Sequence, residues 1–180
     1  FNNGFSDTIG DSAAFFSASH PTISDGNQSN LLAASDLAES TLETALTSIQ
    51  KIKDDRGILI GASAVSLHIP VDYWAVADRV LSSPGNTQTS AAQANPNTNA
   101  INAVRHMGMV PEGYFINRRL TDTDAWFVKT DVPNGTKMFV RSPLQTKMEP
   151  DFDTGNLRFK ARERYSFGVS DWRGFFGSAG

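Results

Sequence analysis

Cysteine is absent from this chain of 180 residues, which excludes disulfide bonds, thiol catalysis and cysteine metal sites. The absence fits an intracellular origin. Charge is sparse: Asp, Glu, Lys and Arg make up 19% of the residues, and the formal net charge is -3. Taken as a whole, such a chain is not a basic nucleic-acid-binding protein. No apolar run approaches the length that crosses a bilayer, and no signal-peptide pattern is present.

The length fits one large domain or two small ones, with enough chain to bury a core. The chain begins at Phe1 rather than at methionine. We therefore expect either that processing removed an N-terminal segment or that the chain is part of a longer protein.

The clearest helix is predicted between Ser35 and Arg56. Asp36 is the expected N-cap, and Glu39 occupies the reciprocal position of a capping box. Gly57 is expected to end the helix as its C′ residue. The apolar stripe of this helix repeats at helical spacing and consists of Leu42, Ala45, Leu46, Ile49 and Ile52.

A second helix is predicted from Pro70, and Pro84-Gly85 is expected to end it. Its apolar face consists of Trp74, Ala77, Val80 and Leu81. The stretch from Ser82 to Ala100 contains no aromatic residue, no large aliphatic residue and no charge. It cannot form core, so we expect a long exposed loop that is a candidate for an outer or axial contact surface.

Several short strands are predicted around these helices. They cover Ile58–Ile60, Val65–Ile69, Tyr114–Asn117, Ala125–Lys129 and Lys137–Arg141, and a final pair flanks the turn from Asp151 to Gly155. Helices and strands in this order predict an α+β arrangement.

The end of the chain, from Leu157 to Gly180, carries the strongest pattern. Leu157, Phe159 and Ala161 alternate with a cationic row. This cationic row consists of Arg158, Lys160, Arg162 and Arg164. Period two at this length predicts a strand with one apolar and one cationic face. The aromatic and glycine-rich tail that follows is expected to be docked, either in the chain's own core, which we favour, or on another subunit. Its aromatic residues are Tyr165, Phe167, Trp172, Phe175 and Phe176.

Three interpretations of the cationic row remain open. A solvated strand face is the default, but four like charges on one face repel each other, and the nearby acids Glu149, Asp151 and Asp153 lie close only to its start. The row can instead pair with acids of a neighbouring subunit or contact a phosphate backbone. We favour the neighbouring subunit, because the net charge is negative and no aromatic residue interleaves on that face.

Signals for enzyme chemistry are weak. His20, His68 and His106 lie far apart without metal-ligand spacing, so structural or exposed histidines are favoured over a metal site. No phosphate-binding loop is present, and two serine-containing stretches lack the closing glycine of a nucleophile elbow. The tripeptide Asp153-Thr154-Gly155 matches the active-site turn of aspartic proteases, which require a second carboxylate from a second copy or a homodimer. A tight turn between two strands is the favoured interpretation.

The order and spacing of several segments is specific when they are taken together. These segments are Phe15–Thr22, Ser29–Leu32, Val65–Leu81, Met107–Tyr114, Leu120–Phe127, Pro133–Gly135, Arg164–Gly168 and Asp171–Gly174. In this order the chain resembles the C-terminal part of the major capsid proteins of tailed phages and prophages of the Hong Kong 97 type, and within them the Mu-like head subunits.

The resemblance implies a structural subunit with no catalytic residues, no cofactor and no metal. It implies an axial domain of helices on a mixed sheet at 34–138, long antiparallel peripheral-domain strands at 139–165 and a return to the axial domain at 166–180. Residues 1–33 would hold the end of a spine helix and an irregular peripheral segment. The N-terminal arm, the extended loop and most of the spine helix of that family are absent from this chain.

The resemblance also implies partners and a location. Copies of the subunit would form pentamers and hexamers of a capsid, with packaged DNA nearby through non-specific proximity. Scaffold, portal or decoration proteins are further implied partners, and no membrane is involved. The location would be the virion, assembled in the cytoplasm of a host bacterium.

Overall fold

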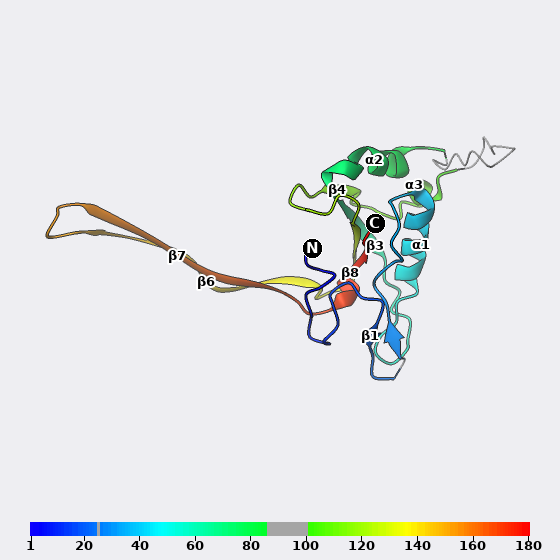
Figure 1. Ribbon diagram of the computed structural model, residues 1–180, viewed down its shortest axis with the longest axis horizontal. Coiled ribbons are helices and arrows are strands. Elements are labelled where there is room, and N and C mark those ends of the chain that lie inside the picture. Colours follow the sequence, from blue (N-terminus) through cyan, green and yellow to red (C-terminus); the bar gives the residue numbers. More distant parts are fainter. Residues whose placement is uncertain (25, 86–100) are drawn as a thin grey trace.

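The computed structural model describes residues 1–24, 26–85 and 101–180, and its architecture is mixed α+β (Figure 1). Most of the polar loop predicted over 82–100 lies outside the described residues. In chain order the elements are β1 (His20–Pro21), β2 (Asn27–Gln28), α1 (Glu39–Gln50), β3 (Ala64–Ile69), the 3-10 turn η1 (Val71–Tyr73), α2 (Trp74–Ser82), α3 (Ala103–His106), β4 (Tyr114–Ile116), β5 (Trp126–Thr130), β6 (Thr136–Pro150), β7 (Leu157–Val169), the 3-10 turn η2 (Trp172–Gly174) and β8 (Phe175–Ser178).

The body of the molecule is built on a four-stranded mixed sheet in the order β4-β3-β5-β8. Strands β3 and β4 are parallel, and the other neighbours are antiparallel. Side chains of β5 alternate between the two faces, so Trp126 and Val128 face one core cluster and Phe127 faces the other. Both faces of this sheet are therefore covered.

Helix α1 covers one face of the sheet. Its predicted apolar stripe is buried together with Leu67 and Ile69 of β3, which confirms the stripe. The buried stripe residues are Leu42, Ala45, Leu46 and Ile49 of the helix and Ile52 just beyond it.

The N-terminal segment and the C-terminal tail cover the other face. Phe16 packs against Phe127 in a tilted arrangement with 4.7 Å between ring centroids, and Trp172 and Phe175 join the same cluster. Phe176 points to the helix side and is buried as well. The predicted docking of the tail is thus confirmed for its last three aromatic residues.

Strands β6 and β7 form a separate antiparallel hairpin that projects from the body as a long arm (Figure 1). Strand β6 has 15 residues and β7 has 13. The difference is taken up by two β-bulges on β6, one between Val140 and Ser142 and one between Ser142 and Gln145. The second bulge contains Pro143, which has no N–H to donate to the ladder. The final pair of strands was predicted correctly, whereas the strand predicted at Lys137–Arg141 is only the first part of β6.

Helix α1 is shorter than predicted. It begins after Ala38, whose N–H donates to Oγ1 of Thr41 at 2.8 Å, so Thr41 and not Glu39 completes the cap. Asp36 is not the N-cap, because its carboxylate instead accepts a hydrogen bond from the Tyr73 hydroxyl at 3.0 Å. The predicted start at Ser35 is therefore wrong.

The end of α1 differs for a local reason. Oδ1 of Asp54 accepts the N–H groups of Arg56 and Ile58 at 2.8 and 2.9 Å, and this side-chain turn competes with continued helix. Gly57, with φ at 86°, belongs to this turn and is not a helix cap. The strand predicted at Ile58–Ile60 is wrong, since only Leu59 forms a single bridge, to Lys53.

The second predicted helix is largely confirmed by η1 and α2. The 3-10 turn η1 begins after Pro70, and α2 ends at Ser82, just before the predicted stop. Ala77 and Val80 are buried as predicted. Trp74 does not belong to the buried face, because it is 55% exposed.

Candidate assembly surface on the β6–β7 hairpin

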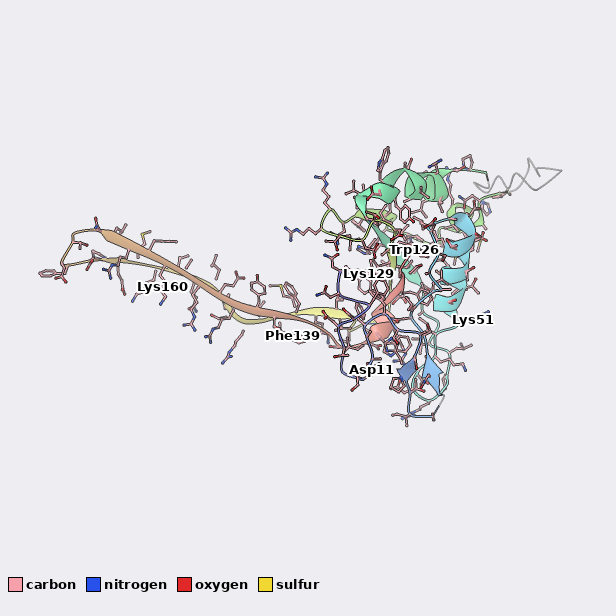
Figure 2. All side chains as sticks on the ribbon, in the orientation of Figure 1. Asp11, Lys51, Trp126, Lys129, Phe139 and Lys160 are labelled. Carbon is pink, nitrogen blue, oxygen red and sulfur yellow. The ribbon has the colours of Figure 1, made fainter. Side chains whose placement is uncertain are left out.

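The four predicted cations of the cationic row lie at alternating positions on β7, and all are exposed. Residues that oppose each other in an antiparallel pair share a face, and Lys160 is opposed by Lys147 of β6. Lys147 therefore joins the row. In Figure 2 the side chains of the arm, Lys160 among them, extend away from the ribbon with no other element of the body over them.

Acids balance the row only at its tip end. Arg158 pairs with Asp151 at 2.6 Å, and Lys147 pairs with Glu149. In the part of the chain that the structure describes, no ion pair reaches the remaining cations Lys160, Arg162 and Arg164. These three side chains form an exposed cationic surface without a local counter-charge.

An aromatic side chain also lies on this face, which corrects the expectation that none does. Phe139 opposes Ser166, two residues beyond Arg164 on β7, and it is 53% exposed. It lies at the root of the arm, beyond the last cation of the row. Sequence inspection of β7 alone missed it because Phe139 belongs to the partner strand, whose register is shifted by the two bulges.

The opposite face of the arm, which we call the apolar face, is exposed as well. Its large side chains are each between 52% and 71% exposed: Met138, Val140, Leu144, Met148, Leu157, Phe159, Tyr165 and Phe167. Together they present on the order of 1,000 Å² of surface, which exceeds the few hundred Å² that monomeric proteins usually leave in one apolar patch. Tyr165 and Phe167 are not docked in the chain's own core, because β7 continues to Val169 before the chain turns back into the body. Docking of these two residues on another subunit stays a prediction.

A groove of about 640 Å³ continues the apolar face at the root of the arm. Phe1 and Ile9 of the N-terminal segment line it on one side, and Met138 and Phe167 of the arm line it on the other. The apolar face therefore extends onto the body.

The tip of the arm is a tight turn. The Gly155 N–H donates to the Asp151 carbonyl at 2.9 Å, and the Thr154 hydroxyl donates to Oδ2 of Asp151 at 2.8 Å. Gly155 has a φ of 68°, which favours glycine. The tripeptide Asp153-Thr154-Gly155 thus forms the turn that joins two strands, at an exposed position where Phe152 is 100% exposed.

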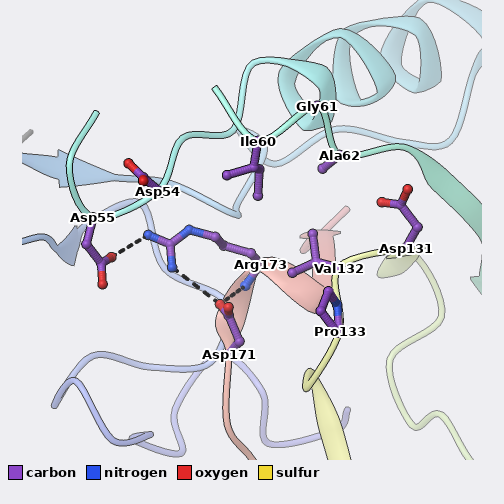
Figure 3. A pocket seen from close by; sticks show the side chains of 10 residues that line it. All are labelled: Asp54, Asp55, Ile60, Gly61, Ala62, Asp131, Val132, Pro133, Asp171 and Arg173. Carbon is purple, nitrogen blue, oxygen red and sulfur yellow. Dashed lines mark hydrogen bonds and ion pairs between the residues drawn. The ribbon is translucent and has the colours of Figure 1, made fainter. Parts of the chain in front are cut away.

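A second hollow, of about 390 Å³, lies where the tail meets the loop between α1 and β3 (Figure 3). Arg173 crosses it and pairs with Asp55 at 2.6 Å and with Asp171 at 3.5 Å. Backbone hydrogen bonds, first that from Ile58, lower the pKa of Asp54 below its ordinary value. The charged groups here are satisfied by one another and by the backbone, so the cluster holds the tail in place.

The three histidines lie in different surroundings. His20 is buried, and His106 is exposed. His68 is half-buried beside the rings of Phe115 and Phe1. Burial, followed by the charge of Lys129, lowers the pKa of His68 and keeps the ring neutral. No group of three or more His, Asp or Glu residues in the described ranges has the arrangement of a metal site.

Comparison with known proteins gives no family, since no protein-family model matches the chain and no curated protein matches its sequence. Among the described residues, no helix combines the length and the apolar character needed to cross a membrane. The molecule is a mixed α+β protein with an exposed two-stranded arm.

Proposed function

We propose that this chain is part of a structural shell subunit, a phage major capsid protein of the Hong Kong 97 type that assembles with copies of itself around double-stranded DNA. The observation that carries the proposal is the β6–β7 arm, which exposes both its faces. A two-stranded hairpin without a covering layer is at best marginally stable in water. An arm with an apolar face of this size therefore needs contact with further protein.

The distribution of charge supports association between copies. The arm, residues 136–169, carries seven Lys or Arg and four Asp or Glu, a net charge of +3. The remaining residues carry nine Lys or Arg and fifteen Asp or Glu, a net charge of -6. Opposite charges on arm and body favour the arm of one copy lying against the body of another. A contact of this heterologous kind produces rings when its rotation closes, and pentamers and hexamers are such rings.

The domain division follows the same proposal. Residues 34–138 form the axial domain, 139–165 the peripheral strands and 166–180 the return. The position of β8 beside β5 supports the return, because it brings the end of the chain back to the sheet. The expected end of a spine helix in residues 1–33 is wrong, because the described residues of this segment contain no helix. The segment is irregular and packs on the sheet through Phe15 and Phe16.

The remaining properties are those of a shell subunit. The protein has no enzymatic activity and no cofactor, it lies near packaged DNA without reading sequence, and its further partners are scaffold, portal or decoration proteins. It is located in the virion after assembly in the bacterial cytoplasm.

The test is charge reversal of the cationic row in the full-length protein. Wild-type protein is expected to form shells or rings in negative-stain electron microscopy, and Arg162→Glu combined with Arg164→Glu is expected to abolish them. The matched control reverses two neighbouring exposed arginines of the body, Arg118→Glu and Arg119→Glu, and is expected to assemble.

The results distinguish a failure of the proposed contact surface from a failure of the proposed function. Normal particles from the arm variant would exclude the cationic row from assembly. Wild-type protein that stays monomeric at every concentration would contradict the proposed function itself.

A further inference from the structure

A buried polar cluster joins the N-terminal segment to the C-terminal tail. We call it the His20 cluster, and its members are Asp11, His20, Asn30 and Trp172. The ring of His20 is fully buried and lies parallel to the indole ring of Trp172, at 5° and with 4.4 Å between centroids. Asn30 is fully buried as well. Buried polar groups of this kind are costly unless each finds a partner.

The carboxamide of Asn30 has only one orientation that satisfies its surroundings. Its Nδ2 donates to the carbonyl oxygens of Phe15, Trp172 and Phe175 at 2.8, 3.1 and 3.1 Å. Its Oδ1 accepts the Ser17 N–H at 2.9 Å. A rotated carboxamide would place an oxygen against three carbonyl oxygens and an amino group against an N–H. Oδ1 is therefore an acceptor for any further neighbour.

This orientation decides the protonation of His20. Nε2 lies 3.0 Å from Oδ1 of Asn30, so Nε2 must carry a hydrogen. Nδ1 lies 2.6 Å from Oδ2 of Asp11, whose other oxygen already accepts the Ala13 N–H at 3.0 Å. A carboxylate accepts here too, so Nδ1 also carries a hydrogen. We propose that His20 is held as an imidazolium ion, paired with Asp11, and that its proton fastens the tail to the N-terminal segment.

The charges around the ring agree with a cation. Asp11 is the acid that faces His20, and the face of Trp172 adds a favourable cation–π contact. The Arg173 guanidinium lies over the same indole at 4.4 Å, but its charge is balanced by Asp55 and Asp171. The net field at the ring therefore comes from the carboxylate.

Loss of the proton would leave a ring nitrogen lone pair against an acceptor oxygen. The tail depends on the same region, since the Gly177 N–H donates to the Asn30 carbonyl at 2.9 Å and the Leu32 N–H donates to the Gly177 carbonyl at 2.8 Å. Both hydrogen bonds of the ring and both backbone bonds of the tail therefore depend on the same few residues, and loss of the ring hydrogen is expected to weaken the attachment of the tail.

Nitrogen NMR of the full wild-type chain, labelled with ¹⁵N at histidine, tests the protonation directly. At about pH 7.5, one unit above the ordinary histidine value, both ring nitrogens of His20 are expected to show the signature of a bonded hydrogen. A bare nitrogen at either ring position of His20 would overturn the proposal. The signal is assigned as the one that disappears in His20→Gln.

Hydrogen exchange tests the attachment of the tail. The Gly177 and Leu32 amides are expected to exchange at least about tenfold faster in His20→Gln than in wild type, because their hydrogen bonds adjoin the cluster. His106→Gln, which changes an exposed histidine, is the matched control with an expected ratio of one. A ratio of one for His20→Gln would show that the His20 ring does not hold the tail.

Discussion

At the scale of single residues, two glycine backbones meet closely where the arm joins the tail. A Cβ added at Gly174 would lie 2.6 Å from the Cα of Gly135, and a Cβ added at Gly135 would lie 3.1 Å from the Cα of Gly174. Both neighbouring atoms belong to the backbone, so no side chain can move aside. The root of β6 and the turn η2 are fixed against each other only because both residues are glycine.

Gly174→Ala is therefore expected to lower the free energy of unfolding by about 1–3 kcal/mol, as overpacking does. Urea denaturation followed by tryptophan fluorescence measures the change. Gly10→Ala is the matched control, because nothing lies within 4 Å of its Cβ position, and its effect is expected to stay within about 0.5 kcal/mol. Equal effects of the two substitutions would show that the backbones separate without cost.

Tyr73 is the residue whose titration the surroundings alter most clearly. Burial, followed by the hydrogen bond to the Asp36 carboxylate and its charge, raises the pKa of Tyr73 to about 12. The folded state thus retains a proton that an unfolded tyrosine loses above about pH 10. The contribution to stability is complete below that pH and is lost as the pH rises from about 10 to 12.

We expect the free energy of unfolding of wild type to fall more steeply between pH 9 and pH 11 than that of Tyr73→Phe, which has no phenol to ionise. Denaturation at both pH values gives the two slopes. Tyr165→Phe, at an exposed tyrosine of the arm, serves as the control and is expected to follow wild type. Parallel slopes for Tyr73→Phe and wild type would exclude a proton held at this phenol.

At the scale of elements, the start of α1 shows that a cap depends on which side chain reaches the backbone. Thr41 Oγ1 accepts the Ala38 N–H at 2.8 Å, one of the donors that a helix leaves without an internal partner. Thr41→Ala is expected to lower stability by about 1 kcal/mol. Thr44→Ala, on the exposed side of the same helix, is the control and is expected to change stability little. A loss of stability in Thr44→Ala larger than that in Thr41→Ala would contradict the capping role of Thr41.

The elements that the sequence predicted well are short runs of β-branched and aromatic residues. Strands β3, β4 and β5 lie within a residue of their predicted bounds, because such runs favour strands whether one face or both faces are covered. The full length of β6 could not be predicted, since its bulges near Pro143 interrupt the alternation. The predicted start of α1 was wrong because Asp36 is a favourable N-cap residue by type, whereas in the structure its carboxylate binds the Tyr73 hydroxyl and Ala38 takes the N-cap position.

The same limit applies to the candidate sites. The cationic row was found because its spacing lies on one strand. Lys147 was not assigned to the row from the sequence. Charged residues also occur at every second position before the turn, at Lys147 and Glu149, and this spacing could have predicted a charged face on the preceding strand. The His20 cluster carries no local signal, because Asn30 meets Trp172 across 142 positions of sequence. Pairs so distant depend on the tertiary fold.

At the scale of the whole molecule, body and arm are stabilised by different means. The sheet of the body is covered on both faces, by α1 on one side and by the N-terminal segment and tail on the other. The arm has hydrogen bonds between β6 and β7 but no covering layer in the described structure. Amide hydrogens are protected from exchange together when they belong to the same buried unit. The body and the arm are therefore expected to open independently of each other.

We therefore expect the β6–β7 amides of the unassembled protein to exchange at least about 100-fold faster than the β5 amides, because the isolated hairpin is only marginally stable. If copies cover the arm as we propose, the arm amides gain protection in assembled particles, while the β5 amides, already covered within one chain, serve as the internal control and do not change. Hydrogen exchange with mass spectrometry on both forms gives this comparison. Equal protection of arm and β5 in the monomer would mean that the hairpin is stable by itself, and the need for a neighbouring copy, on which the proposed function rests, would be gone.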